Sequence, residues 1–115
     1  MKSGRDRRTH PRVALHMLVQ FRLETMEDFL AQYAGNISAG GMFIRSNEPR
    51  ESGSLIYLQF RLKSGEKLIE GLGRVVHVNP VGHEEPGMGV EFVNLDPESV
   101  TLIERIVQER IGDEP

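Results

Sequence analysis

The stretch IYLQFRLKSGEKLIEGLGRVVHVN, residues 56–79, decides the fold that the sequence predicts. Apolar side chains occupy every second position over residues 56–62, which is the period of a β-strand with one buried face. Residues 63–66 are polar and contain a glycine, as a hairpin turn requires. A second long strand follows over residues 67–79, in which two glycines indicate a bulge or a sharp bend: Gly71 and Gly73.

The same alternation occurs on both sides of this hairpin. Towards the N-terminus, one face of a long first strand is formed by Val13, Leu15, Met17, Val19, Phe21 and Leu23. We predict further strands over residues 29–34, 42–44 and 88–92, joined by polar connections at residues 46–54 and 80–87. Six strands with no helix between them predict an antiparallel barrel or sandwich.

The period of the apolar residues changes after residue 95. Asp96 suits the N-cap of a helix, Pro97 its first position and Glu98 its first turn. Apolar residues then recur at helical spacing, at Val100, Ile103, Ile106, Val107 and Ile111. We therefore predict an amphipathic helix over residues 96–112 that packs against the barrel or, alternatively, against a partner protein.

Length and composition predict one soluble domain. The chain has 115 residues, of which 38% are hydrophobic and 27% charged, and these values are typical of a single folded domain. Cysteine is absent, which excludes disulfides and cysteine-based zinc sites. No apolar run has the length of a membrane span or a signal peptide. We expect a cytoplasmic domain comprising a flexible arm (1–11), a barrel (12–95) and a helix (96–112).

Charge is distributed unevenly along the chain. Residues 1–12 hold five basic residues and one acidic residue, whereas the remainder holds nine basic and sixteen acidic residues. A cationic arm on an acidic body favours an anionic ligand that the arm contacts locally. It argues against a general nucleic-acid binder, which would carry a basic face on the body too. The alternative is a solvated basic tail.

Two short motifs carry the functional signal. The first, Arg8-Thr9-His10-Pro11-Arg12, precedes the first predicted strand, and the second, Asn36-Ile37-Ser38-Ala39-Gly40-Gly41, joins the second and third. Together they resemble the RxxxR and [D/N]xSxxG motifs of the PilZ family. The resemblance extends to the GMGVEF strand of residues 87–92 and to the closing helix, and so covers essentially the whole chain.

The resemblance implies a six-stranded antiparallel PilZ-like β-barrel with a C-terminal helix, and a site for cyclic di-GMP. The ligand-binding residues that it implies are Arg8, Arg12, Asn36, Ser38 and Gly41, with Arg7 as a further candidate. Guanidinium groups suit this ligand because they bind phosphate bidentately, pair with the O6/N7 edge of guanine and stack on purines.

The second motif also has a purely structural interpretation, in which its polar residues and glycines only build a tight turn. Two positions depart from the family pattern. Asn36 stands where aspartate is commoner, which keeps an acceptor but removes the charge that would pair with guanine N1–H and N2–H2. His77 stands where many relatives have a large aromatic residue.

Other functions have weaker support in the sequence. The four histidines lack metal-ligand spacing and no nucleophile–base pattern occurs, so we expect neither a metal nor an enzyme. We predict a cyclic di-GMP effector, monomeric or weakly homodimeric, whose arm becomes ordered on ligand binding. It would signal to a separate partner protein in motility, polysaccharide or biofilm control. The alternative is a PilZ-like interaction adaptor that binds no nucleotide. No DNA or RNA partner is expected.

Overall fold

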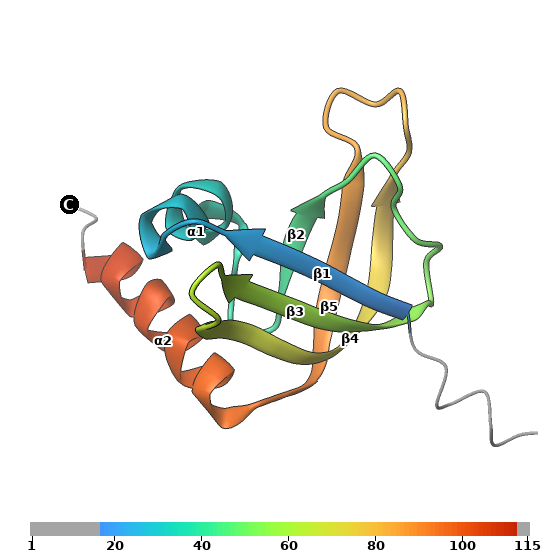
Figure 1. The fold of residues 1–115 in the computed structure, drawn as a ribbon. Coiled ribbons are helices and arrows are strands. Elements are labelled where there is room, and N and C mark those ends of the chain that lie inside the picture. Colours follow the sequence, from blue (N-terminus) through green and yellow to red (C-terminus); the bar gives the residue numbers. More distant parts are fainter. Residues whose placement is uncertain (1–16, 113–115) are drawn as a thin grey trace, which may run out of the picture.

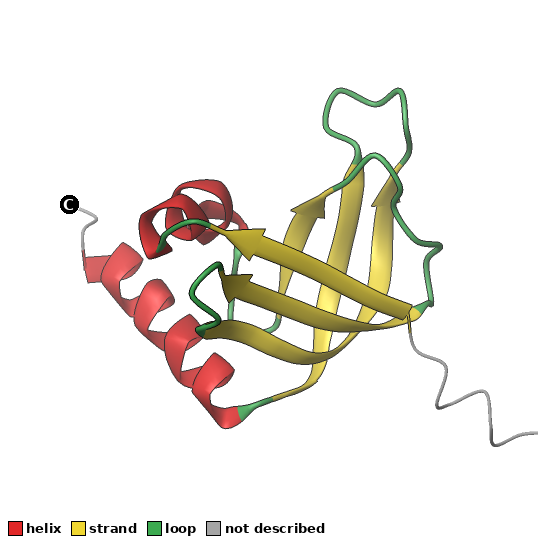
Figure 2. Cartoon of the chain, in the orientation of Figure 1, coloured by secondary structure: helices red, strands yellow, loops and turns green. Residues whose placement is uncertain are grey.

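The fold is a strongly curled sheet with two helices at one end (Figures 1 and 2). A computed structural model describes residues 17–112. The elements in chain order are β1 (Met17–Leu23), α1 (Met26–Tyr33), the short 3-10 helix η2 (Ala34–Asn36), β2 (Gly41–Arg45), β3 (Leu55–Leu62), β4 (Lys67–Asn79), β5 (Gly87–Leu95) and α2 (Pro97–Gly112). The five strands lie in the order β1-β3-β4-β5-β2 and form a half-barrel.

The hairpin predicted from residues 56–79 is confirmed. β3 pairs antiparallel with β4, and the bond from the Leu62 amide to the Glu66 carbonyl closes the turn at 2.9 Å. The predicted bend in β4 is also present, because its pairing with β5 shifts register between Leu72 and Gly73. Gly71 has a φ of +150° and lies so close to the backbone of Leu95 that a side chain would collide with it. The two glycines thus allow β4 to bend across β5.

The expectation of six antiparallel strands is wrong in two respects. Residues 17–112 contain five strands, and β1 pairs with β3 in parallel. Parallel neighbours need a crossover connection, and α1 together with β2 supplies it, so that the chain returns to the same end of the sheet before β3 begins. The sheet is therefore mixed. The predicted start of the first strand at residue 13, and the boundary between arm and barrel, lie outside the described residues.

The strand predicted over residues 29–34 is instead the helix α1. Thr25 caps it by accepting a hydrogen bond from the Asp28 amide at 3.1 Å, and acidic residues occupy the first turn. The buried and half-buried positions recur at helical spacing, namely Met26, Phe29, Leu30 and Tyr33. A window of six residues was too short to separate this pattern from strand alternation, whereas the cap at Thr25 identifies the helix.

An aromatic cluster fixes α1 to the sheet. The ring of Phe60 on β3 stacks on Phe21 of β1, with 4.8 Å between centroids, and meets Tyr33 edge-on at 5.1 Å. Phe29 and Phe60 are completely buried. Because α1 leads directly into the second motif, this cluster holds that motif at a defined place beside the sheet.

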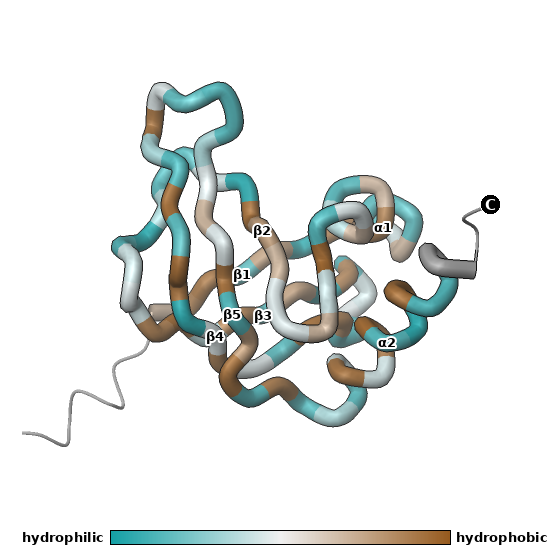
Figure 3. The backbone as a smooth tube through the Cα atoms, turned by 180° about the vertical axis from the view of Figure 1, so that it is seen from behind, coloured by the Kyte–Doolittle hydropathy of each residue, from teal (hydrophilic) through white to brown (hydrophobic). Residues whose placement is uncertain are grey.

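The C-terminal helix is present as predicted and packs against β4. Ile103 and Ile106 are buried, whereas Val100, predicted to belong to the apolar stripe, is 42% exposed. Hydrophobic and hydrophilic residues alternate along α2 in Figure 3, as expected for a helix with one covered face. The Ile111 side chain lies outside the described part of the chain. Neither helix within residues 17–112 is both long enough and apolar enough to cross a bilayer.

The first turn of α2 is tied to β4 by polar contacts. Lys67 Nζ lies 2.6 Å from Asp96 Oδ2, and this hydrogen bond raises the pKa of Lys67 although desolvation opposes it. The buried Ser99 accepts a hydrogen bond from the Glu70 amide at 2.8 Å. Asp96 accepts the first helical bond through its carbonyl, from the Val100 amide at 3.1 Å, which places it at the N-cap as predicted.

Candidate ligand-binding site

The second motif forms a tight turn between η2 and β2. An isolated antiparallel bridge joins Ile37 to Met42, and the Ser38 amide donates to the Gly41 carbonyl at 2.8 Å. Ser38 Oγ accepts from the amides of Gly40 and Gly41, both at 3.3 Å, and donates to the Gly41 carbonyl at 3.2 Å. The hydroxyl therefore already uses its donor and both acceptor positions within the turn.

Gly41 has a structural role in this turn. A Cβ atom at this position would overlap the carbonyl oxygen of Val90, so the β2–β5 pairing requires glycine here. Gly40 is different, because nothing lies within 4 Å of the place where its Cβ would be. Asn36, at the end of η2, is exposed, and so are Ser38 and Gly40. The turn thus presents its polar atoms at the surface.

A single row of residues runs across the outer face of the sheet from this turn. Successive Cα partners in the row are Gly41 on β2, Glu91 on β5, Arg74 on β4 and Leu55 on β3. Partners in adjacent strands present their side chains on the same face. The opposite face is the core, where the neighbouring positions Ile56, Val75 and Val90 are buried. The row therefore faces away from the core.

The first motif lies outside the described residues, and this applies to Arg7, Arg8 and Arg12. The place where the chain joins the sheet is nevertheless defined, because β1 begins at Met17 and Met17 pairs with Ile56, next to Leu55. Strands lie about 4.8 Å apart, so four steps from β1 to β2 span roughly 19 Å along the sheet. Four residues lie between Arg12 and Met17, and the five Cα–Cα steps that join them can span up to about 18 Å before the side chain is counted. Chain length thus allows the arginines to reach the turn.

Two charged residues of the row were missed by the sequence reasoning. Arg74 Nη1 lies 3.8 Å from Glu91 Oε1, and the side chains are 47% and 56% exposed. Neither residue belongs to a recognisable motif. Only the strand register shows that they lie between the second motif and the start of β1.

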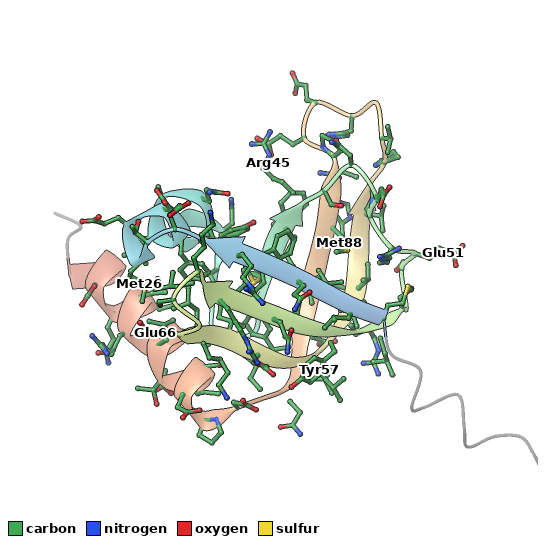
Figure 4. All side chains as sticks on the ribbon, viewed as in Figure 1. Met26, Arg45, Glu51, Tyr57, Glu66 and Met88 are labelled. Carbon is green, nitrogen blue, oxygen red and sulfur yellow. The ribbon has the colours of Figure 1, made fainter. Side chains whose placement is uncertain are left out.

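A second polar group on the outer face surrounds Glu70, which is only 8% exposed. Its carboxylate accepts from Tyr57 Oη at 2.9 Å, from Gln59 Nε2 at 3.1 Å and from Arg61 Nη2 at 2.8 Å. Desolvation tends to raise the pKa of Glu70, but the bonds from Arg61, Gln59 and Tyr57 outweigh it and lower the pKa from its ordinary value of 4.5. The bond to Glu70 also raises the pKa of Tyr57, which is labelled in Figure 4.

The two described histidines form local contacts. His77 Nε2 lies 2.8 Å from Asn79 Oδ1, and His83 Nδ1 accepts from the Glu85 amide at 2.9 Å. Within residues 17–112, no three His, Asp or Glu side chains are grouped so as to hold a metal ion. A hollow of about 630 Å³ lies between α2 and the β3–β4 turn, near Met26 and Glu66 in Figure 4. The second motif does not line this hollow.

The sequence matches the family of PilZ domains over residues 6–109, which is nearly the whole chain. The chain therefore belongs to the PilZ family. This membership marks it as an effector-type domain of the class that binds cyclic di-GMP, and the family is not known for enzymes. No curated protein matched the sequence.

Proposed function

We propose that the chain binds cyclic di-GMP between its N-terminal arginine motif and the turn of residues 36–41. Arg8 and Arg12, with Arg7 as a further contact, would hold phosphate and guanine groups. The observation that carries the proposal is the row on the outer face of the sheet. It begins beside the strand that the arginine motif precedes, and it ends at Gly41.

The second motif supplies the opposite side of this site. The exposed amide of Asn36 has both a donor and an acceptor for a guanine edge. Ser38 holds the turn in shape through its bonds to the Gly40 and Gly41 amides. Asn36 is neutral, so the contact that it makes with guanine N1–H and N2–H2 is weaker than one from aspartate.

The output of the protein is proposed to be an interaction. Ligand binding would order the arginine arm against the sheet and create a surface for a separate partner protein. The partner would belong to the control of motility, surface polysaccharide or biofilm formation. The chain itself performs no chemistry and needs no metal in this proposal.

Calorimetric titration of cyclic di-GMP into the full chain tests the proposal. Wild type should bind, and Arg8→Ala/Arg12→Ala should lose binding, because charge and stacking contacts disappear together. Arg22→Ala/Arg105→Ala, which removes two exposed cations of β1 and α2, is the charge-matched control and should bind as wild type does. Absence of binding by wild type at high micromolar ligand would overturn the proposal.

A second candidate function is an interaction adaptor that binds no nucleotide. It is favoured by one observation: the contacts of Ser38 and Gly41 are fully explained by the turn and by strand packing. Ser38→Ala separates the two candidates. If the turn contributes to the ligand site, its loosening should weaken cyclic di-GMP binding while the protein remains folded by circular dichroism. Unchanged affinity in a folded Ser38→Ala protein would reduce the motif to a structural turn.

A further inference from the structure

The row between the two motifs contains a cation that neither motif includes. Arg74 is the Cα partner of Leu55 on one side and of Glu91 on the other, and Glu91 is the partner of Gly41. At about 4.8 Å per strand, Arg74 is roughly 10 Å along the sheet from Gly41. A ligand held along this row, between the turn and an arm that arrives from β1, would lie over Arg74 and Glu91.

We infer that Arg74 is a further ligand-binding residue of this site, and that Glu91 is the counter-ion that occupies its guanidinium in the ligand-free protein. The inference rests on the proposed function and extends it to residues of the folded sheet. In the bound state, a phosphate of cyclic di-GMP or the O6/N7 edge of a guanine would replace the Glu91 carboxylate on Arg74.

The geometry of the pair supports the exchange of Glu91 for a ligand phosphate on the Arg74 guanidinium. A single contact of 3.8 Å joins Arg74 Nη1 to Glu91 Oε1, and both side chains are about half exposed. An exposed ion pair of this kind contributes little, because water and salt screen it. A phosphate offers a bidentate and shorter contact with the same guanidinium, which is the stronger arrangement. The ligand can therefore displace Glu91 at small cost.

A purely structural role for the pair is the competing explanation. Arg61 on the same face shows what such a role looks like, since its Nη2 and Nε atoms both bond to Glu70 Oε1, at 2.8 and 3.3 Å. Arg74 has no comparable second bond to its acidic partner. Within residues 17–112, the one polar contact of its guanidinium is the 3.8 Å approach to Glu91, which uses one of its five N–H donors.

Glu91 then has a defined effect on affinity. Its carboxylate competes for Arg74 and places a negative charge close to the phosphates, so both effects oppose binding. Removing the charge with Glu91→Gln should strengthen binding. The part of the gain that acts through Arg74 should disappear when Arg74 is absent, whereas simple repulsion of the ligand would persist.

The experiment is a titration of cyclic di-GMP into the full chain at low salt, with a double-mutant cycle over Arg74→Ala and Glu91→Gln. Arg74→Ala should raise the Kd by about tenfold or more, in the range of a lost charge-assisted contact. Glu91→Gln should lower the Kd several-fold, and should have a clearly smaller effect in the Arg74→Ala background. Arg22→Ala is the matched control, because Arg22 is an exposed arginine on the same outer face, at the far end of β1. It should leave the Kd within twofold.

Two results would overturn the inference while the proposed function survives. In the first, wild type binds and Arg8→Ala/Arg12→Ala abolishes binding, but the Kd of Arg74→Ala differs from that of wild type no more than the Kd of Arg22→Ala does. In the second, Glu91→Gln binds cyclic di-GMP more weakly than wild type does, which would make Glu91 a direct contact of the ligand and not a counter-ion of Arg74. Failure of wild type itself to bind would instead remove the proposed function. Circular dichroism and thermal unfolding of each variant exclude misfolding as the cause.

Discussion

The outer face of the sheet carries two polar groups that are built in opposite ways. Around Glu70, three neighbours donate to one nearly buried carboxylate at 2.8 to 3.1 Å. At Arg74 and Glu91, two half-exposed side chains share one contact of 3.8 Å. Both groups join adjacent strands, and both contain an arginine and a glutamate. They differ in how completely their hydrogen-bonding capacity is used within the protein.

This difference distinguishes a polar group that stabilises the fold from the pair that we propose for ligand binding. A buried carboxylate with all its partners present rigidifies the sheet, and it would have to break several bonds to contact anything else. A long and exposed ion pair adds little stability and leaves donors free. The Glu70 group therefore belongs to the framework, since it also links β4 to α2 through the Glu70 amide and Ser99. The Arg74–Glu91 pair is the one that we propose for the ligand.

The largest expected effect on stability comes from a substitution at Gly41, the residue at one end of the row. Gly41→Ala places a Cβ against the Val90 carbonyl, so β2 and β5 must separate locally, and we expect a loss of about 3 kcal/mol of unfolding free energy. Denaturant unfolding measures this loss. Gly40→Ala is the matched control: its Cβ would meet nothing within 4 Å, and its stability should stay within about 0.5 kcal/mol of wild type. Equal stabilities of the two variants would contradict the assigned role of Gly41.

Glu70→Ala should have the next largest effect. It leaves the donors of Tyr57, Gln59 and Arg61 without their shared acceptor, and we expect a loss of about 2 kcal/mol. Glu91→Ala, measured in the same chemical denaturation experiment, should change stability by less than about 0.5 kcal/mol. If the two glutamates proved equally important, the division into framework and binding surface would not hold.

Acid should weaken the framework through Glu70. The folded-state pKa of Glu70 is lowered, so its contribution is complete above the ordinary value of 4.5 and is lost as the pH falls through the folded-state pKa. The effect should be smaller than that of Glu70→Ala, because a protonated carboxyl still accepts from Tyr57 and Gln59. Unfolding curves from about pH 6 to about pH 3 measure it, because carboxylates titrate within this range. Glu70→Gln should lose stability less steeply over this range, and an unchanged slope would assign the acid sensitivity to other groups.

The smallest expected effect on the stability of the protein is that of removing the Arg74–Glu91 ion pair. Arg74→Ala should change the free energy of unfolding by no more than about 0.5 kcal/mol, since the lost ion pair is exposed and long. Added salt should not change this difference, because there is little attraction to screen. A loss above about 1 kcal/mol would show that Arg74 supports the fold.

Much of the fold followed from local pattern. Alternation over residues 56–62, a polar turn and a glycine-marked bend were enough to predict the central hairpin, and Asp96 with Pro97 marked the start of α2 correctly. These features are local, since each depends on neighbours within one strand, turn or helical turn. The helix α1 was not predicted because its apolar residues also suit a short strand; the cap at Thr25 is the local signal that distinguishes the two.

The candidate site was likewise predicted in part from local sequence patterns, and the rest of it required the structure. The two motifs and the family were evident from the sequence, because they are contiguous patterns of arginine, serine and glycine. The assignment of roles within the second motif needed the structure, which shows that Ser38 bonds within the turn and Gly41 faces Val90. The Arg74–Glu91 pair has no sequence signal, since the two residues are seventeen positions apart in ordinary strand sequence.

The sequence by itself therefore determined the β-rich domain, the closing helix, the family and the identity of the two motifs. Only the tertiary structure decided that β1 lies parallel to β3, that the sheet has a mixed order, and that one outer row connects the start of β1 with the second motif. The physical reason is that strand pairing is non-local. Hydrogen bonds between strands are equally available to many registers, and the choice among them is made by which faces can be buried together.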